Sequence, residues 1–141
     1  MITANQIDLA HIQTEVEAVF LAYETALMSN DLKVLDQLFW HSPLAVRFGT
    51  AENLYGMEAI RAFRKARDTG TLKRILRNSR ITTFGHDFAT TTTEFIREDQ
   101  SIGRQSQTWA RFPEGWRIVS AHISLNENKS EITSENSARE A

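Results

Sequence analysis

One cation of this sequence stands in an apolar neighbourhood. Arg47 lies between Val46 and Phe48 in a short alternating stretch. Because an unpaired guanidinium is costly to bury, Arg47 needs either an acidic partner, such as Glu52 or Glu94, or an anionic ligand. Its planar fork of donors matches the two oxygens of a carboxylate. A structural ion pair and a carboxylate site are both compatible with this pattern.

A phenol and an imidazole could exchange protons beside such a cation. Tyr23 falls on the apolar stripe of a predicted helix, either as a core tyrosine with a backbone partner or as a donor aimed into a pocket. His122 falls on the last predicted strand, where Trp116, Ser120 and Ser124 share its alternating face. It is either a wall residue or a proton carrier, since imidazole titrates near neutral pH. Both side chains join the arginine as candidate catalytic groups.

Other kinds of chemistry have little support in the sequence. The four histidines are scattered without metal-ligand spacing, and the chain has no cysteine. Its six glycines stand far apart, so there is no glycine-rich phosphate loop, and there is no Gly-x-Ser-x-Gly elbow. We expect neither a metal nor a cofactor.

Length and composition are typical of one globular domain. The chain has 141 residues, of which 41% are hydrophobic and 24% are charged. A formal net charge of −2 gives no electrostatic reason to expect nucleic acid or an anionic membrane as a partner. The sequence also lacks a signal-peptide pattern and an apolar stretch of spanning length. Together with the absence of cysteine, this predicts a cytoplasmic location.

Three helices are predicted in the first half of the chain. Apolar residues recur at steps of three and four from about Gln6 to Met28, which indicates a long amphipathic helix with Glu24 outside its apolar stripe. Asp31 can cap a second, short helix that ends near Trp40. A third helix follows a glycine-bracketed turn. Its basic residues are expected on a solvated face: Arg61, Arg64, Lys65 and Arg67.

The remainder of the chain predicts β-structure. A short strand from Leu44 to Phe48 places Arg47 on the side opposite its larger apolar residues. Four long strands joined by short turns then predict an antiparallel meander. Their expected ranges are Arg74 to Phe84, Phe88 to Arg97, Gly103 to Phe112 and Trp116 to Leu125.

This order of elements predicts an α+β fold, a cone-shaped half-barrel in which a curved antiparallel sheet wraps around the N-terminal helices. We expect the domain over residues 1–125 and a polar, disordered tail over 126–141. No long strand has a fully apolar face, so we expect a polar pocket and a homodimer interface on the sheet. Besides Arg47, the candidate residues for binding a ligand in that pocket are Glu94, Gln105, Gln107 and Trp109.

Several segments resemble the AtzH/HpxZ-like family. The most specific is Gly103-Arg104-Gln105-Ser106-Gln107-Thr108-Trp109, and Val46-Arg47-Phe48-Gly49 and Glu52-Asn53-Leu54-Tyr55-Gly56 precede it in the family's order. The resemblance covers roughly residues 16–125. It implies the cone-shaped fold of the SnoaL-like branch of the nuclear-transport-factor-2-like superfamily, with dimers through the outer sheet face.

The same resemblance implies a function in the breakdown of small ureido compounds. One member is associated with the cyanuric acid pathway as a decarboxylating amidohydrolase of 1,3-dicarboxyurea, and others accompany oxalurate breakdown. The residues proposed for catalysis there look similar to Tyr23 and Arg47. The resemblance therefore predicts an amidohydrolase in which Arg47 clamps a carboxylate of the substrate. Tyr23 would donate or shuttle a proton, His122 would assist, and water would attack.

Two further functions stay open. The first is a non-catalytic accessory subunit that holds a small carboxylate-bearing ligand for an amidase partner. The second is an isomerase or dehydratase of the ketosteroid-isomerase type, which needs a carboxylate base in an apolar pocket. Glu94 is the candidate base for that reaction, and its exposure to solvent would remove this alternative.

Overall fold

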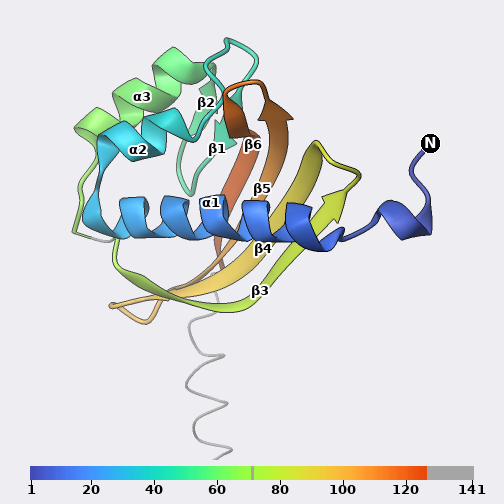
Figure 1. The fold of residues 1–141 in the computed structure, drawn as a ribbon. Coiled ribbons are helices and arrows are strands. Elements are labelled where there is room, and N and C mark those ends of the chain that lie inside the picture. Colours follow the sequence, from blue (N-terminus) through green and yellow to red (C-terminus); the bar gives the residue numbers. More distant parts are fainter. Residues whose placement is uncertain (71, 127–141) are drawn as a thin grey trace, which may run out of the picture.

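One long helix lies across the hollow side of a curved six-stranded sheet (Figure 1). The computed structural model describes residues 1–70 and 72–126, so the predicted tail lies outside the described residues except for Asn126. Two shorter helices cover one end of the sheet. The predicted α+β half-barrel is therefore confirmed.

The elements follow the predicted order, with two short additions. They are a 3₁₀ turn (Ala4–Gln6), α1 (Ala10–Ser29), α2 (Leu32–Gln37), β1 (Val46–Phe48), β2 (Asn53–Tyr55), α3 (Met57–Ala66), β3 (Arg74–Phe84), β4 (Phe88–Arg97), β5 (Ile102–Phe112) and β6 (Gly115–Asn126). The strand β2 lies where a turn is predicted, because it pairs with β1 as an antiparallel hairpin. No helix among the described residues has the length and apolarity needed to cross a membrane.

The sheet has the strand order β2-β1-β6-β5-β4-β3. Strands β3 to β6 form the predicted antiparallel meander. The strand β1 pairs in parallel with β6, with Arg47 opposite Ala121. This pairing attaches the strand that carries Arg47 to the last strand of the meander.

The predicted and observed helices differ slightly in where they begin and end. The Asp31 side chain accepts a hydrogen bond from the Val34 backbone N–H at 3.3 Å and caps α2 as predicted. The helix α2 ends at Gln37, before the predicted end near Trp40. The reason is that the chain joins the sheet here: the Trp40 N–H donates to the Ile118 carbonyl at 2.9 Å, and the Ile118 N–H donates to the Leu38 carbonyl at 2.7 Å.

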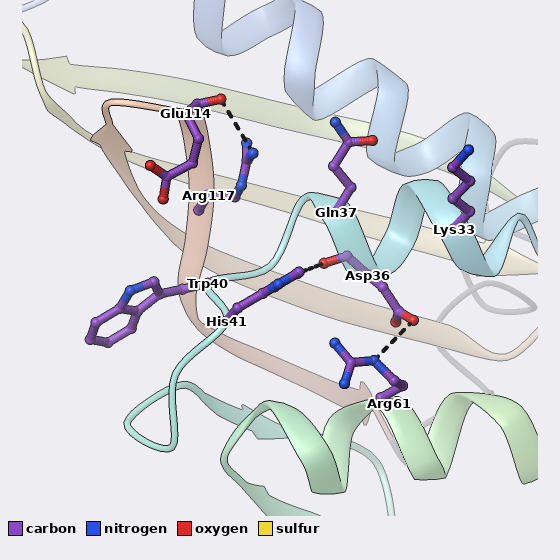
Figure 2. Close-up of a pocket in the computed structure, with 8 residues that line it drawn as sticks. All are labelled: Lys33, Asp36, Gln37, Trp40, His41, Arg61, Glu114 and Arg117. Atoms are coloured by element: carbon purple, nitrogen blue, oxygen red, sulfur yellow. Dashed lines mark hydrogen bonds and ion pairs between the residues drawn. The ribbon is translucent and has the colours of Figure 1, made fainter.

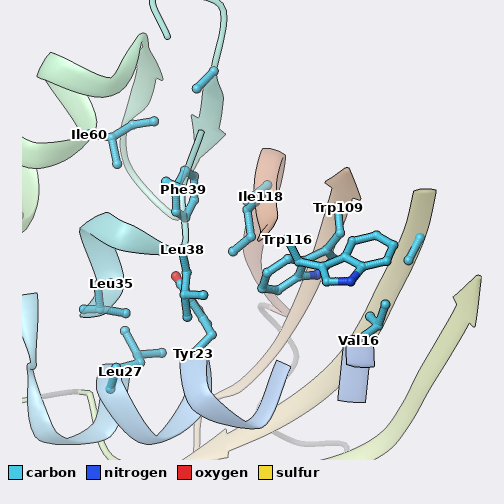
Figure 3. Close-up of a cluster of buried hydrophobic side chains, with 14 of the residues drawn as sticks. Val16, Tyr23, Leu27, Leu35, Leu38, Phe39, Ile60, Trp109, Trp116 and Ile118 are labelled. Carbon is cyan, nitrogen blue, oxygen red and sulfur yellow. The ribbon is translucent and has the colours of Figure 1, made fainter. Parts of the chain in front are cut away.

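The core fills the space between α1 and the concave side of the sheet (Figure 3). Trp109 is fully buried, and its indole N–H donates to the Thr91 hydroxyl at 3.1 Å. Tyr23 and Phe39 lie with ring centroids 6.3 Å apart where α1 meets the segment after α2. Burying side chains of this size contributes about 1.5–3 kcal/mol each, so this cluster fixes the position of α1 on the sheet.

A β-bulge in β6 changes which residues face the core. Thr108 of β5 pairs with Ser120, but the next residue pairs with Ile118, so that Val119 is an extra residue. Because the bulge shifts the alternation by one, Ile118 is buried before it and Ala121 after it. The prediction that His122 shares a face with the buried Trp116 is therefore wrong, and His122 is exposed.

Candidate functional site

A small cavity of about 50 Å³ opens between α1, the end of α3 and the inner face of the sheet. That volume holds about three to five water molecules, so a ligand must be small unless the walls move. The polar groups that line it are Tyr23, Arg47, Arg67, Arg74, Arg97 and Gln105. Three of them, Tyr23, Arg47 and Gln105, are predicted site residues that the structure brings together.

Of the two alternatives for Arg47, the ion pair is present, with Glu52 as the partner, and the cation still lines the cavity. Its Nη1 donates to Glu52 Oε1 at 3.0 Å, and the guanidinium lies 5.3 Å from the centre of the Phe63 ring. Arg47 is 6% exposed, and its buried Nε has no hydrogen-bond partner among the described residues. Because Glu52 satisfies only one side of the guanidinium, donor capacity is left for a ligand.

Tyr23 reaches the same space from α1. Its hydroxyl accepts a hydrogen bond from Arg64 Nη2 at 3.5 Å. Arg64 is 1% exposed, stacks 4.5 Å from the centre of the Phe39 ring and pairs with Asp36 at 3.4 Å. Burial raises the pKa of Tyr23, but the positive charges of Arg64 and then Arg47 outweigh that effect. The pKa of Tyr23 is consequently lower than the ordinary value of 10.0.

A buried carboxylate that the sequence pattern misplaced holds two residues of the cavity lining in place, Arg74 and Gln105. Glu24 is 3% exposed and receives two hydrogen bonds from Arg74, one of them from Nε at 3.1 Å. Gln105 accepts from Arg74 at 2.8 Å and donates to Glu24 at 3.0 Å. The prediction that Glu24 lies outside the buried stripe is wrong because its partner is an arginine 50 residues later, which helical spacing cannot indicate.

The basic residues of α3 do not all face solvent, contrary to prediction. Arg61 and Lys65 are exposed, whereas Arg64 is buried and Arg67 is partly buried against the cavity. Two nitrogens of Arg67, Nε and Nη2, are buried without a partner among the described residues. Burial lowers the pKa of Arg67 to about 10.

The arginines in and beside the cavity differ in whether a carboxylate pairs with them. Arg47, Arg64 and Arg74 each have a carboxylate within ion-pair distance. Arg67 has none among residues 1–70 and 72–126. A partly buried cation without a counter-ion is costly, and an anionic ligand in the cavity would remove that cost.

Two predicted site residues lie on the outer face of the sheet, away from the cavity. His122 packs edge-on to Phe48, with ring centroids 5.8 Å apart. Glu94 pairs with Arg77 at 3.1 Å and accepts from Asn78 at 2.7 Å, and these hydrogen bonds lower the pKa of Glu94. The prediction that Glu94 binds a ligand in the pocket, or acts there as a base, is therefore wrong.

The two other predicted pocket residues, Gln107 and Trp109, are inward-facing but belong to the core. The Gln107 side-chain oxygen accepts from Thr91 at 3.0 Å, and Trp109 donates to the same hydroxyl. Neither residue lines the cavity. The prediction was right about the face of β5 and wrong about how far along the strand the cavity extends.

Phe95 and Gly103 hold two of the cavity arginines in place. The Phe95 ring lies against Gly103, while the guanidinium groups of Arg74 and Arg97 lie 4.4 and 5.5 Å from the ring centre. A side chain at position 103 would overlap this ring. The lack of a side chain at Gly103 therefore sets the positions of Arg74 and Arg97.

Replacing Gly103 with alanine should lower the free energy of unfolding by about 1–3 kcal/mol, because the Phe95 ring must move. Urea denaturation measures this change. Ser106→Ala, on the exposed face of the same strand, is the control and should change the value by less than about 0.5 kcal/mol. Equal stability of the two variants would contradict the packing role of Gly103.

A wider depression lies on the surface between α2, α3 and the turn before β6 (Figure 2). Asp36 connects it to the arginine beside Tyr23, since this carboxylate pairs with the exposed Arg61 at 3.5 Å and with the buried Arg64 at 3.4 Å. The depression is open, and none of the residues lining it has a buried unpaired polar atom among the described residues. Residues 1–70 and 72–126 contain no group of three His, Cys, Asp or Glu side chains that could hold a metal ion. The arginine-lined cavity is therefore the stronger candidate site.

Comparison with known proteins agrees with this fold. A model of the family described as AtzH-like matches residues 5–129. A crystal structure of a DUF3225-family protein of unknown function from Pectobacterium atrosepticum is 52% identical, with a TM-score of 0.88 over 90% of this chain and 100% of that one. A cystatin-like fold protein from Burkholderia xenovorans is 47% identical, with a TM-score of 0.81 over 84% of this chain and 95% of that one.

More distant similarity extends to a nuclear transport factor 2-like superfamily protein from Salmonella enterica. It is 25% identical, with a TM-score of 0.69 over 84% of this chain and 94% of that one. No curated protein matches the chain. The chain is thus similar to solved structures that share its half-barrel fold.

Proposed function

The chain belongs to the AtzH-like family as a small-molecule-binding domain, and from this premise we propose that it is an amidohydrolase of a small ureido carboxylate. One observation carries the proposal. The cavity places an unpaired guanidinium, Arg67, and a half-paired one, Arg47, beside the hydroxyl of Tyr23. Such a set of donors suits a compact substrate that carries a carboxylate next to a carbonyl or amide group.

The carboxylate is held by the free donors of Arg47 and Arg67. Hydrogen bonds between a guanidinium and a carboxylate are shorter and stronger than neutral ones, and two of them fix the orientation of the substrate. Gln105 lies on the same wall with its amide already committed to Glu24 and Arg74. It therefore holds the wall in place and leaves the charge recognition to the two arginines.

The reaction requires a proton for the leaving nitrogen. Water adds to the carbonyl carbon, the C–N bond breaks and its electron pair stays on nitrogen, which takes up a proton. When the group removed is an N-carboxylate, the products are the free amide and bicarbonate. Tyr23 supports this step because its hydroxyl can donate to the developing oxyanion or the leaving nitrogen, and each such donor contributes on the order of 3 kcal/mol.

The test is turnover of 1,3-dicarboxyurea, allophanate and oxalurate by the purified protein, followed through loss of the substrate and release of bicarbonate, ammonia or urea. We expect turnover of at least one of them and its loss in Tyr23→Phe. Arg77→Met, which removes a half-exposed cation from the outer face, is the matched control and should retain activity. Calorimetry with the same compounds separates the alternatives. Binding without turnover would favour the accessory subunit, and the absence of both would contradict the two functions together.

The predicted homodimer, amidase partner and cytoplasmic location stay predictions. Isomerase chemistry that relies on Glu94 is not proposed, because that carboxylate lies outside the cavity and is bound to Arg77 and Asn78.

A further inference from the structure

Arg64 touches Tyr23 without lining the cavity. The guanidinium is held between the Phe39 ring at 4.5 Å and the Asp36 carboxylate at 3.4 Å. Its Nη2 donates to the Tyr23 oxygen at 3.5 Å. This contact occupies a lone pair of the phenol and leaves the phenol's proton uncommitted.

That proton has no acceptor among the described residues. The nearest cations can only donate, because a guanidinium has no acceptor atom. The two carboxylates that pair with cavity arginines are engaged, Glu24 by Arg74 and Gln105, and Glu52 by Arg47. An ionised Tyr23 oxygen would be surrounded by donors, whereas a neutral one has an O–H without a partner until an anion enters.

We propose that Arg64, anchored by Asp36, is a positioning residue that makes Tyr23 the proton-exchanging group of the cavity. In the empty cavity the phenol gives up its proton more readily than an exposed tyrosine does. When a carboxylate binds, it accepts a hydrogen bond from the phenol and favours the neutral form. The role in turnover rests on the proposed function, whereas the ionisation of Tyr23 does not.

The charged residues that face Tyr23 come from several elements. They are Arg64 of α3, Arg67 directly after α3, Arg47 of β1, Arg74 of β3 and Glu24 of α1. Burial raises the pKa of Tyr23, and Glu24 acts in the same direction, but the surrounding arginines outweigh both, Arg64 most strongly. The direction of the pKa therefore agrees with the geometry.

Anion binding should act in the opposite direction. A carboxylate beside Arg67 and Arg47 adds negative charge near the phenol and offers its proton an acceptor, and both effects favour the neutral form. The pH at which Tyr23 titrates should therefore rise in the presence of the ligand.

The chain has two tyrosines, and the second, Tyr55, is 66% exposed, so it is an internal reference. Tyrosine labelled with carbon-13 at Cζ reports each ionisation separately by NMR, with Tyr55→Phe for assignment. We expect Tyr23 to titrate at a lower pH than Tyr55 in the wild type. Malonate, a stable dicarboxylate, should raise the titration pH of Tyr23 and leave that of Tyr55 unchanged.

Variants of α3 identify the residue responsible. Arg64→Met should raise the titration pH of Tyr23 by about one unit, as expected for the loss of one nearby opposite charge. Arg64→Lys should restore part of the difference. Arg61→Met is the matched control, because Arg61 also pairs with Asp36 but is exposed and does not contact Tyr23. It should leave the titration of Tyr23 unchanged.

Titration of Tyr23 at or above the pH of Tyr55 in the folded wild type would overturn the proposal, and this measurement needs no core substitution. Equal effects of Arg61→Met and Arg64→Met would overturn the role of Arg64. A low titration pH without turnover of any ureido acid would contradict the proposed function alone. Turnover with an ordinary titration of Tyr23 would contradict this inference alone.

Discussion

Replacing Arg47 with methionine should weaken carboxylate binding by about 10- to 100-fold, because a hydrogen bond to a charged group contributes about 1.5–3 kcal/mol. Arg47 is 6% exposed, so water cannot take its place beside the ligand without opening the cavity. Turnover should fall further than binding if the same contact also orients the substrate. Calorimetry with malonate and the ureido acids measures the first effect, and initial rates measure the second.

A second substitution, at Glu52, separates the effect of Arg47 on binding from its effect on stability. The Arg47→Met variant leaves Glu52 without its partner at 3.0 Å, although 20% of the Glu52 side chain reaches solvent. The double variant Arg47→Met with Glu52→Gln should recover thermal stability but no affinity. Arg77→Met on the outer face should leave affinity unchanged. Wild-type affinity in a folded Arg47→Met variant would contradict the proposed carboxylate site.

Replacing Arg67 with methionine should have effects of opposite sign on stability and on binding. The variant removes two buried, unpaired guanidinium nitrogens and relieves repulsion from Arg47 and Arg64. We expect the empty protein to gain about 1 kcal/mol, an amount reduced for the partial exposure of this side chain. The affinity for malonate should fall about tenfold, since the cavity loses a cation that has no carboxylate within ion-pair distance among the described residues.

The pH dependence of that gain follows from the lowered pKa of Arg67, which is about 10. A cation whose pKa is lower in the folded than in the unfolded protein destabilises the fold at every pH below the folded pKa. This cost fades as pH rises above about 10, where the folded form has lost the proton and the unfolded form still holds it. The difference between the variant and the wild type should therefore be constant from pH 6 to about 9.

The matched control for Arg67 is Lys65→Met, which removes an exposed cation two residues earlier. It should change both stability and malonate affinity by little. Thermal melts with and without malonate compare the three proteins directly. Lower stability of Arg67→Met without ligand would show that Arg67 has a counter-ion after all and would remove the main support for an anionic ligand.

The strands of the meander were predictable to within one residue, because the alternation and turn residues that define them are local. The burial of Arg47 was expected from its apolar neighbours, but alternation could not predict it, because the structure buries the side with Ala45 and Arg47 and exposes Leu44. The extra residue of the bulge, Val119, made the prediction for His122 wrong. Such a bulge cannot be recognised from the alternation of residues in a single strand.

The charged part of the site was mostly hidden from sequence reasoning. A helix pattern separates apolar from polar residues, so it assigned Glu24, Arg64 and Arg67 to the surface. Their burial depends on partners from other elements, such as Arg74 for Glu24 and Asp36 for Arg64. Long polar side chains leave the surface only where such partners meet, and that information lies in the tertiary structure.

The parallel pairing of β1 with β6 also affects how the protein is made. The ribosome releases α1 and β1 early, and β1 can pair with β2 at once, but it gains β6, its neighbour on the other side, only after the last strand has been synthesised. Gln105 and Ile123, which line the cavity from β5 and β6, arrive equally late. The cavity is therefore completed only when the last strands pair, as one of the final, sequence-distant events of folding.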